Sequence, residues 1–289
     1  MIHSTARLTA SGSRLVAALV VLFALSPAGL LAQQQTAAAT PADAGAAADK
    51  ADLAKQTQNP IASLITVPFQ NNTNFGVGDT RRVQNLLNIQ PVVPFALSDN
   101  LTLVTRAIIP VLRQPIGLND SISGLGDVNL QTFFVPKLKT KGIMVGAGPA
   151  FGLRTETDEA LGSGRWTAGP SAVIVAMPGK FVVGALYQQL FSFAGDKDRG
   201  AVNSMLFQYF INYNLADGWA ISSAPSLIAN WKAKGGERWT IPFGGGIAKV
   251  FSIGKRHYKV SVAAYANVVH PTGAPDTQLQ ATWFFLFPK

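Results

Sequence analysis

The sequence predicts an all-β protein: a transmembrane, antiparallel, up-and-down β-barrel of about 12 strands behind an N-terminal signal peptide. Apolar and polar residues alternate with a period of two in segment after segment. The connections between these segments show no helical apolar period, which excludes parallel crossovers. The last strand, in LQATWFFLFPK, is bulky and apolar although no covering element accompanies it. Such a strand needs an apolar solvent on its outer face.

The first 32 residues have the pattern of a secretory signal peptide. Arg7 and Arg14 precede the apolar run LVAALVVLFAL and the small-residue region SPAGLLA, with a candidate cut after Ala32. The apolar run is too short to span a membrane. We therefore expect residues 1–32 to be removed on export. Removal takes away two of the 24 basic residues and none of the 15 acidic ones, so the mature chain keeps a basic surplus of seven.

This basic surplus fits three kinds of partner: nucleic acid, an acidic membrane surface, or anions in a channel. No basic run is interleaved with aromatic residues in the way that single-strand binding requires, so nucleic acid is not an expected partner. The chain has no cysteine, which excludes disulfides and thiolate metal sites. No cofactor is expected.

Residues 33–59 differ from everything that follows them. The segment is rich in Ala, Gln, Asp and Lys and has no aromatic residue, so it reads as a tether on the periplasmic side. Residues 46–58 could form a short helix. Two interpretations follow: a plug or partner-binding arm, and a solvated periplasmic leader, of which the leader is favoured.

From Pro60 onward, to residue 289, the chain has the pattern of the barrel itself. Segments rich in Val, Ile, Phe, Tyr, Trp and Thr are bounded by Gly, Pro, Asn or Asp clusters. The predicted strands are 61–70, 83–96, 101–113, 127–136, 143–154, 166–177, 181–193, 203–214, 219–231, 239–252, 257–269 and 278–287.

The connections between the strands alternate in length. NNTNFGVGDTRR is long and LSDN is short, QPIGLNDSISGLG is long and KLKTKG is shorter, and the later connections continue this series. Outer-membrane barrels have short periplasmic turns and longer external loops. An even number of strands then places both termini on the periplasmic side.

Aromatic residues lie where strands meet loops, as expected of the two membrane interfaces. The outer girdle is predicted to contain Phe69, Trp166, Phe193, Trp231 and Trp239, and the inner girdle Phe95, Phe181, Tyr213, Trp219, Phe251, Tyr258 and Phe287.

Charged residues in mid-strand identify the inner face of the barrel. A lipid-facing Arg or Lys near the bilayer midplane costs about 2–4 kcal/mol, so Arg106 and Lys259 are assigned to the lumen. In the last strand Trp283 and Phe285 point outward, and Gln280 and Thr282 point inward; closure pairs this strand with the first one. The predicted pore-lining residues are Asn88, Gln90, Arg106, Asn129, Gln131, Arg154, Gln208, Asn212, Asn230, Lys259 and Asn267. They serve either as a cationic lining that favours anions or acidic aromatic solutes, or as internal networks that fill the barrel.

Several stretches carry a resemblance to a known family: NPIASLITVPFQNNTNFG, LNIQPVVPF, GLGDVNLQTFF, ALGSGRWTAGPSAV, FSFAGD, NYNLADGW and FFLFP. Over about residues 50–289 the chain resembles the bacterial outer-membrane barrels labelled neuromedin U-like, which are related to the phenol and meta-pathway degradation transporters. The resemblance implies passage of small, often hydrophobic molecules and implies no residue-level mechanism. One departure is that Phe287 is followed by Pro288 and Lys289, whereas the assembly signal of outer-membrane proteins usually ends in an aromatic residue.

Catalytic and metal sites have little support in the sequence. Only His257 and His270 remain after signal removal, and both lie beside predicted turns or loops. The acidic residues gather in the predicted external loops, where TETDEALGSG does not match an EF-hand. We expect no enzyme activity and no metal site.

The predicted function is passive diffusion of small solutes, with apolar or aromatic ones as candidates, through a barrel in the bacterial outer membrane. A 12-stranded lumen is expected to be narrow or partly plugged. The expected partners are outer-membrane lipid and lipopolysaccharide, the solute, and the barrel-assembly machinery. The alternative is a structural or adhesive barrel with a filled interior and functional external loops.

Overall fold

The computed structural model describes residues 53–287; the predicted signal peptide and most of the predicted tether lie outside this range. The described chain forms one 15-segment sheet in which every pairing is antiparallel. Its strands are β1 (Ile65–Val77), β2 (Arg82–Ile89), β3 (Val92–Ser98), β4 (Leu101–Ile116), β5 (Asp120–Leu125), β6 (Val128–Pro136), β7 (Ile143–Leu153), β8 (Arg165–Ala176), β9 (Phe181–Gly195), β10 (Asn203–Asn214), β11 (Trp219–Ser223), β12 (Ser226–Asn230), β13 (Trp239–Ile253), β14 (Arg256–Val269) and β15 (Thr277–Phe287).

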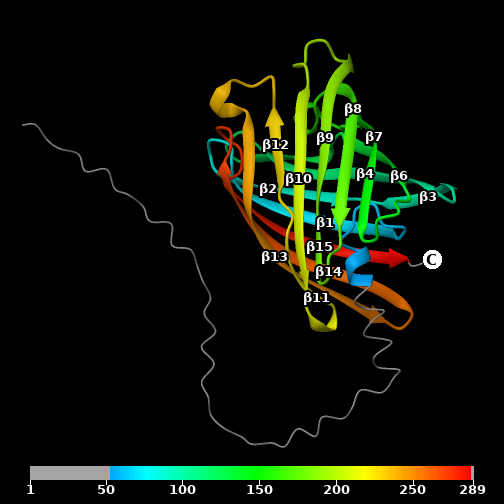
Figure 1. Ribbon diagram of the computed structural model, residues 1–289. Coiled ribbons are helices and arrows are strands. Elements are labelled where there is room, and N and C mark those ends of the chain that lie inside the picture. Colours follow the sequence, from blue (N-terminus) through cyan, green and yellow to red (C-terminus); the bar gives the residue numbers. More distant parts are fainter. Residues whose placement is uncertain (1–52, 288–289) are drawn as a thin grey trace, which may run out of the picture. The chain divides into compact units, whose positions relative to one another are not determined.

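The sheet closes into the predicted barrel of 12 strands (Figure 1). Three barrel strands are each interrupted once, as β2 with β3, β5 with β6, and β11 with β12, so the 15 segments make 12 strands. The last strand pairs with the first from Ile65↔Phe287 to Phe75↔Thr277. Closure leaves no unpaired edge, as a strand in hydrocarbon requires.

Helical structure is minor. Residues 53–56 form one helical turn, and three short 3-10 helices lie in connections: η1 (Glu159–Leu161), η2 (Ala216–Gly218) and η3 (Gly235–Glu237). Within residues 53–287 no helix has both the length and the apolar character that crossing a membrane demands.

Proline accounts for two of the strand interruptions. Pro91 separates β2 from β3, and Pro225 separates β11 from β12; neither has a backbone N–H for the ladder. At the second break, lumen side chains replace the missing ladder bonds. The backbone N–H of Ala224 donates to the Tyr265 hydroxyl at 3.3 Å, and Gln208 Nε2 donates to the Ala224 carbonyl at 3.1 Å.

The predicted bounds of the first strand and of its connection are wrong. β1 begins at Ile65 and continues to Val77, so the connection that was predicted to be long is only residues 78–81. Likewise β4 and β5 extend as a hairpin around residues 117–119. The alternation of connection lengths therefore fails at one place, where the connection 117–119 is shorter than the turn 137–142 that follows it. Strand extension was missed because Asn71–Asn74 are poor strand formers taken alone, and cross-strand hydrogen bonds hold them in place.

The wall of the barrel has an apolar outer surface. Ile174, Val262 and Trp283 point outward and are 50%, 52% and 40% exposed. The inward neighbours Val173 and Val175 are buried. Aromatic side chains are exposed close to both ends of the barrel, including Phe95, Phe181, Trp219 and Phe287 at one end and Trp166, Phe193 and Trp231 at the other. Phe69 does not lie at a barrel end, because β1 continues past it and it pairs with Trp283.

The two ends of the barrel are distinguished by their connections. The turn end has residues 99–100, 137–142, 177–180, 215–218 and 254–255, and the loop end has 78–81, 117–119, 154–164, 196–202, 231–238 and 270–276. Ile65 and Phe287 both lie at the turn end, where the first strand enters and the last strand leaves.

Candidate solute pathway in the barrel lumen

Residues 53–64, here called the plug segment, are buried in the turn end of the barrel, where the blue helical turn lies in Figure 1. Both ends of the segment pack against β13 and β15: Leu53, Ala54, Ala62 and Leu64 form one apolar cluster with Val250 and Leu286. Ile61 is 1% exposed and belongs to a second cluster on the opposite wall, with Val92, Val104, Phe133, Val135, Val173, Val175, Val182, Leu186 and Phe210. The plug segment is therefore anchored on two sides by apolar contacts.

Polar contacts fix the plug segment as well. Gln58 and Asn214 exchange two side-chain hydrogen bonds, of 2.8 and 3.1 Å. Asn59 Nδ2 lies 3.0 Å from Met144 Sδ, and Asn59 Oδ1 accepts from the backbone N–H of Ile61 at 3.0 Å. Residues 53–59 were assigned to a solvated tether, and that interpretation does not hold for them, since their apolar side chains are buried in the barrel.

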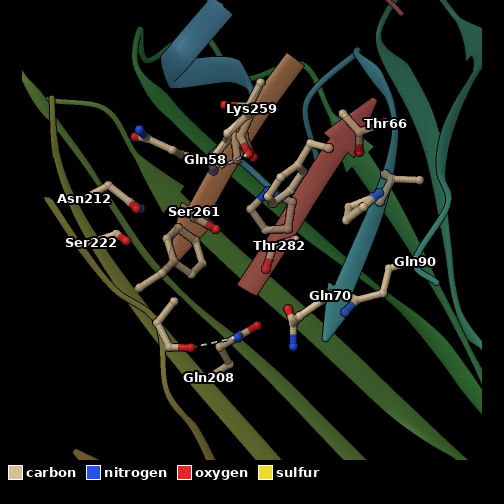
Figure 2. Close-up of a pocket in the computed structure, with 18 of the residues that line it drawn as sticks. Gln58, Thr66, Gln70, Gln90, Gln208, Asn212, Ser222, Lys259, Ser261 and Thr282 are labelled. Carbon is tan, nitrogen blue, oxygen red and sulfur yellow. Dashed lines mark hydrogen bonds between the residues drawn. The ribbon is translucent and has the colours of Figure 1, made fainter. Parts of the chain in front are cut away.

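An inner cavity of about 170 Å³ adjoins the plug segment (Figure 2). Residues 56–60 line one end of the cavity, and its walls come from β1, β3, β4, β10, β11, β14, β15 and the two proline breaks. Figure 2 shows Lys259, Ser261 and Thr282 pointing into this space from β14 and β15. The lining alternates between amides or hydroxyls and apolar side chains, including Val92, Phe210 and Phe284.

An outer cavity of about 410 Å³ continues toward the loop end. The two cavities share wall residues: Gln70, Gln90, Arg106, Gln208, Ala224, Tyr265 and Gln280. Amides are the commonest polar side chains of the outer cavity, beside apolar residues such as Leu86, Ile108 and Leu206. Several amides are linked by hydrogen bonds into a group here called the amide ladder: Gln70, Asn72, Asn74, Gln84, Gln114, Gln278 and Gln280. All of its members except Gln84 and Gln114 line the outer cavity. None of the described residues that line either cavity is acidic. The lumen thus has walls of mixed polar and apolar side chains and carries positive charge.

Arg106 lies at the junction of the two cavities and is held by amides. One guanidinium nitrogen donates to Gln90, and the other lies 3.5 Å from Gln131 Oε1. Gln131 is 1% exposed and donates in turn to Gln188 on β9. This chain of amides fixes the orientation of the guanidinium and leaves its charge without a counter-ion among the described residues.

The structure brings most of the predicted pore-lining residues together. Those that line one or both cavities are Asn88, Gln90, Arg106, Gln131, Gln208, Asn212, Lys259 and Asn267. Three do not line either cavity. Arg154 lies beyond β7 in the loop 154–164, where it pairs with Glu156, and Asn230 is exposed at the end of β12. Asn129 has a buried Oδ1 without a hydrogen-bond partner.

Sequence reasoning missed the contribution of β1 to the lumen, and it offered a plug before the first strand only as the less favoured of two interpretations. Asn72 and Asn74 were placed in a loop, and no inward face was assigned to the first strand. The available signal was alternation in the correct register, because Thr66, Pro68 and Gln70 line the inner cavity at every second position. The inward positions predicted for Gln280 and Thr282 are confirmed.

The histidines do not form a triad in the described chain. Ser252 Oγ and His257 Nδ1 are 2.8 Å apart at the β13–β14 turn, which is the contact that a nucleophile and its base require. No acidic side chain of residues 53–287 lies within 4.0 Å of His257, so no carboxylate orients the ring. His270 Nε2 lies 3.6 Å from Asp276 in the loop 270–276, and the same carboxylate pairs with Arg81.

A pair of carboxyl groups, Asp127 and Glu156, lies at the loop end of the barrel. The Glu156 side chain is 8% exposed, and burial, followed by its hydrogen bond with Asp127, raises the pKa of Glu156. Asp127 Oδ2 accepts from the backbone N–H and hydroxyl of Ser163, both at 2.7 Å. In the described part of the chain, no group of three or more His, Cys, Asp or Glu residues has a metal-binding arrangement.

The chain matches no family model and no curated protein. Among solved structures it is similar to the COG4313 outer membrane channel from Pseudomonas putida F1, with 18% identity, a TM-score of 0.57, and coverage of 78% of this chain and 94% of that one. Weaker matches are the CymD monoaromatic hydrocarbon channel (10% identity, TM-score 0.46, 83% and 91% covered) and outer membrane phospholipase A from Escherichia coli (13%, 0.44, 77% and 90%). The first likeness shows that the two chains share a fold. The two weaker likenesses, with TM-scores under 0.5, add nothing about the function of this chain. Membership of the neuromedin U-like family stays a prediction.

Proposed function

We propose that this chain is an outer-membrane barrel through which small solutes, apolar and aromatic ones among them, cross by passive diffusion. One observation carries the proposal: two cavities with common walls follow each other along the lumen, from the plug segment toward the loop end. The description of the Pseudomonas putida protein as an outer membrane channel agrees with it. The apolar outer wall supports a location in lipid.

In this proposal the turn end faces the periplasm and the loop end faces outward, as in other barrels with longer external loops. Lipid and lipopolysaccharide surround the wall, and the barrel-assembly machinery inserts it. The plug segment then lies at the periplasmic mouth, where it limits the size of what passes.

Single-channel recording of the refolded protein in a planar bilayer tests the proposal. Discrete openings, together with faster entry of small aromatic solutes into proteoliposomes than into empty liposomes, are expected. A bilayer that stays sealed would reject diffusion through the lumen. Heat-shifted gel mobility and partition into the cell envelope test the location, and a stable monomer in detergent-free buffer would overturn it.

A structural or adhesive barrel with a filled interior is the second candidate. The plug segment and the apolar cluster around Ile61 favour it, because together they fill the turn end. In that case the bilayer stays sealed both with the complete protein and after removal of residues 53–62.

A further inference from the structure

The inner cavity contains two cations and no acidic group. Arg106 and Lys259 both line it, and all the ion pairs of the described chain lie elsewhere, in loops. A buried cation without a counter-ion is unfavourable, so two of them in one cavity are not expected where side chains only fill the lumen. The arrangement favours an anion.

Lys259 has unused hydrogen-bonding capacity. The residue is 7% exposed, and its ammonium group has three donors. Within the described residues its hydrogen bond is a long one, 3.4 Å to the backbone carbonyl of Thr57 in the plug segment. Nζ also lies 4.5 Å from the centre of the Phe284 ring, where the cation–π attraction partly compensates for lost water. An anionic oxygen would satisfy the remaining donors.

Arg106 is the more rigid of the two. Its guanidinium is held by Gln90 and Gln131, so it offers further N–H donors in a fixed plane. A planar fork of this kind matches the two oxygens of a carboxylate.

Apolar side chains complete the cavity. Leu64, Val92, Phe210 and Phe284 contribute to its lining, so the cavity presents an apolar surface beside the cations. The size also sets a limit. A dry cavity of about 150 Å³ accommodates one benzene molecule, and this cavity measures about 170 Å³.

We propose that the inner cavity is a binding site for a small aromatic acid of one ring, whose carboxylate lies between Arg106 and Lys259 and whose ring lies against Phe210 and Phe284. The inference rests on the proposed function and narrows it from small solutes to monocyclic aromatic carboxylates. The site selects the acid over a neutral compound of the same shape, because only the acid brings a negative charge to the two cations.

Calorimetric titration of the complete mature protein in detergent tests the site with three probes: benzoate, benzyl alcohol and acetate. Benzoate is expected to bind at least about tenfold more tightly than either other probe, since charged hydrogen bonds and ring burial each contribute. The variants Lys259→Met and Arg106→Gln are expected to lose about tenfold in benzoate affinity and to keep their affinity for benzyl alcohol. Lys259→Arg keeps the charge and should keep the preference.

Lys249→Met is the matched control. Lys249 lies on β13 at the turn end, and its ammonium is 4.9 Å from the Trp219 ring and does not line either cavity. This variant should bind benzoate like the wild type. Heat-shifted gel mobility identifies any variant that has not folded.

Two results would overturn the inference: equal affinity for benzoate and benzyl alcohol, or a Lys259→Met variant that is folded and keeps the preference. Conductance separates this failure from failure of the proposed function. A protein that conducts without preferring benzoate rejects only the acid site. A sealed protein that binds benzoate keeps the site and rejects the channel.

Discussion

The two halves of the lumen are built in different ways. The turn half is filled by the plug segment and by the apolar cluster around Ile61, whereas the loop half is lined by the amide ladder and encloses the larger cavity. Apolar contacts exclude water and resist opening. Amides readily exchange a hydrogen bond to another amide for one to water. Passage is therefore expected to be limited at the turn end, with the loop half serving as a wet vestibule.

Removing the plug segment is the strongest way to test this difference. A mature chain that begins at residue 63 should show a several-fold larger single-channel conductance, because residues 56–60 line the inner cavity at the turn end and their removal opens the space they occupy. A chain that begins at Leu53 is the control, and it should conduct like the complete mature protein. Equal conductance of all three chains would show that the plug segment does not limit passage.

Ile61→Ala tests how tightly the plug segment is held. Ile61 is 1% exposed in a well-packed cluster, so its truncation is expected to cost about 2–5 kcal/mol in the free energy of unfolding. Leu118→Ala, in the turn 117–119 where Leu118 is 75% exposed, should change it by less than about 0.5 kcal/mol. Urea titration of the protein in detergent measures both. Similar losses would mean that the plug segment contributes no packing energy.

The difference between the halves also explains what could be read from the sequence. Period-two alternation is a local signal, so it located the barrel strands and put Arg106, Gln280 and Lys259 on the inner face. It could not decide between a plug and a solvated leader for the segment before β1, where a few apolar residues such as Leu53 and Ile61 are too sparse to show a period. Their burial depends on contacts with strands far along the chain, which a local pattern does not contain.

The bounds of β1 were missed for a related reason. Asn72 and Asn74 are typical of turns, but Gln280 and Gln278 donate to their side chains, at 3.1 and 3.0 Å, from the last strand. The pairing of the two chain ends, more than 200 residues apart, decides that these residues form a strand.

Replacing a buried amide should lower the free energy of unfolding more than replacing an amide that faces the outer cavity. Gln131→Leu leaves Gln188 without its amide partner and Arg106 with Gln90 alone, at a position that is 1% exposed, so it is expected to lower the free energy of unfolding by about 1–3 kcal/mol. Gln280→Leu, in the amide ladder, should cost less, because water from the outer cavity can replace the lost bond. Urea midpoints of the two variants, compared at equal slope, decide the order. A larger loss for Gln280→Leu would contradict a wet vestibule.

The smallest expected effect concerns the loop 154–164, at the outer edge of the vestibule. Burial and Asp127 raise the pKa of Glu156 above its ordinary value of 4.5, so the folded loop binds this proton more tightly than the unfolded chain does. The resulting stabilisation is complete below about pH 4.5 and is lost as pH rises through the raised value. Hydrogen exchange of the loop amides, corrected for the intrinsic pH dependence, should therefore show greater protection at low pH. Glu156→Gln should remove the pH dependence, and Glu159→Gln, whose side chain is 91% exposed, should retain it. Protection that rises with pH in the wild type would mean that Asp127 and Glu156 do not share a proton. A contact of the ionised carboxylates would then hold the loop.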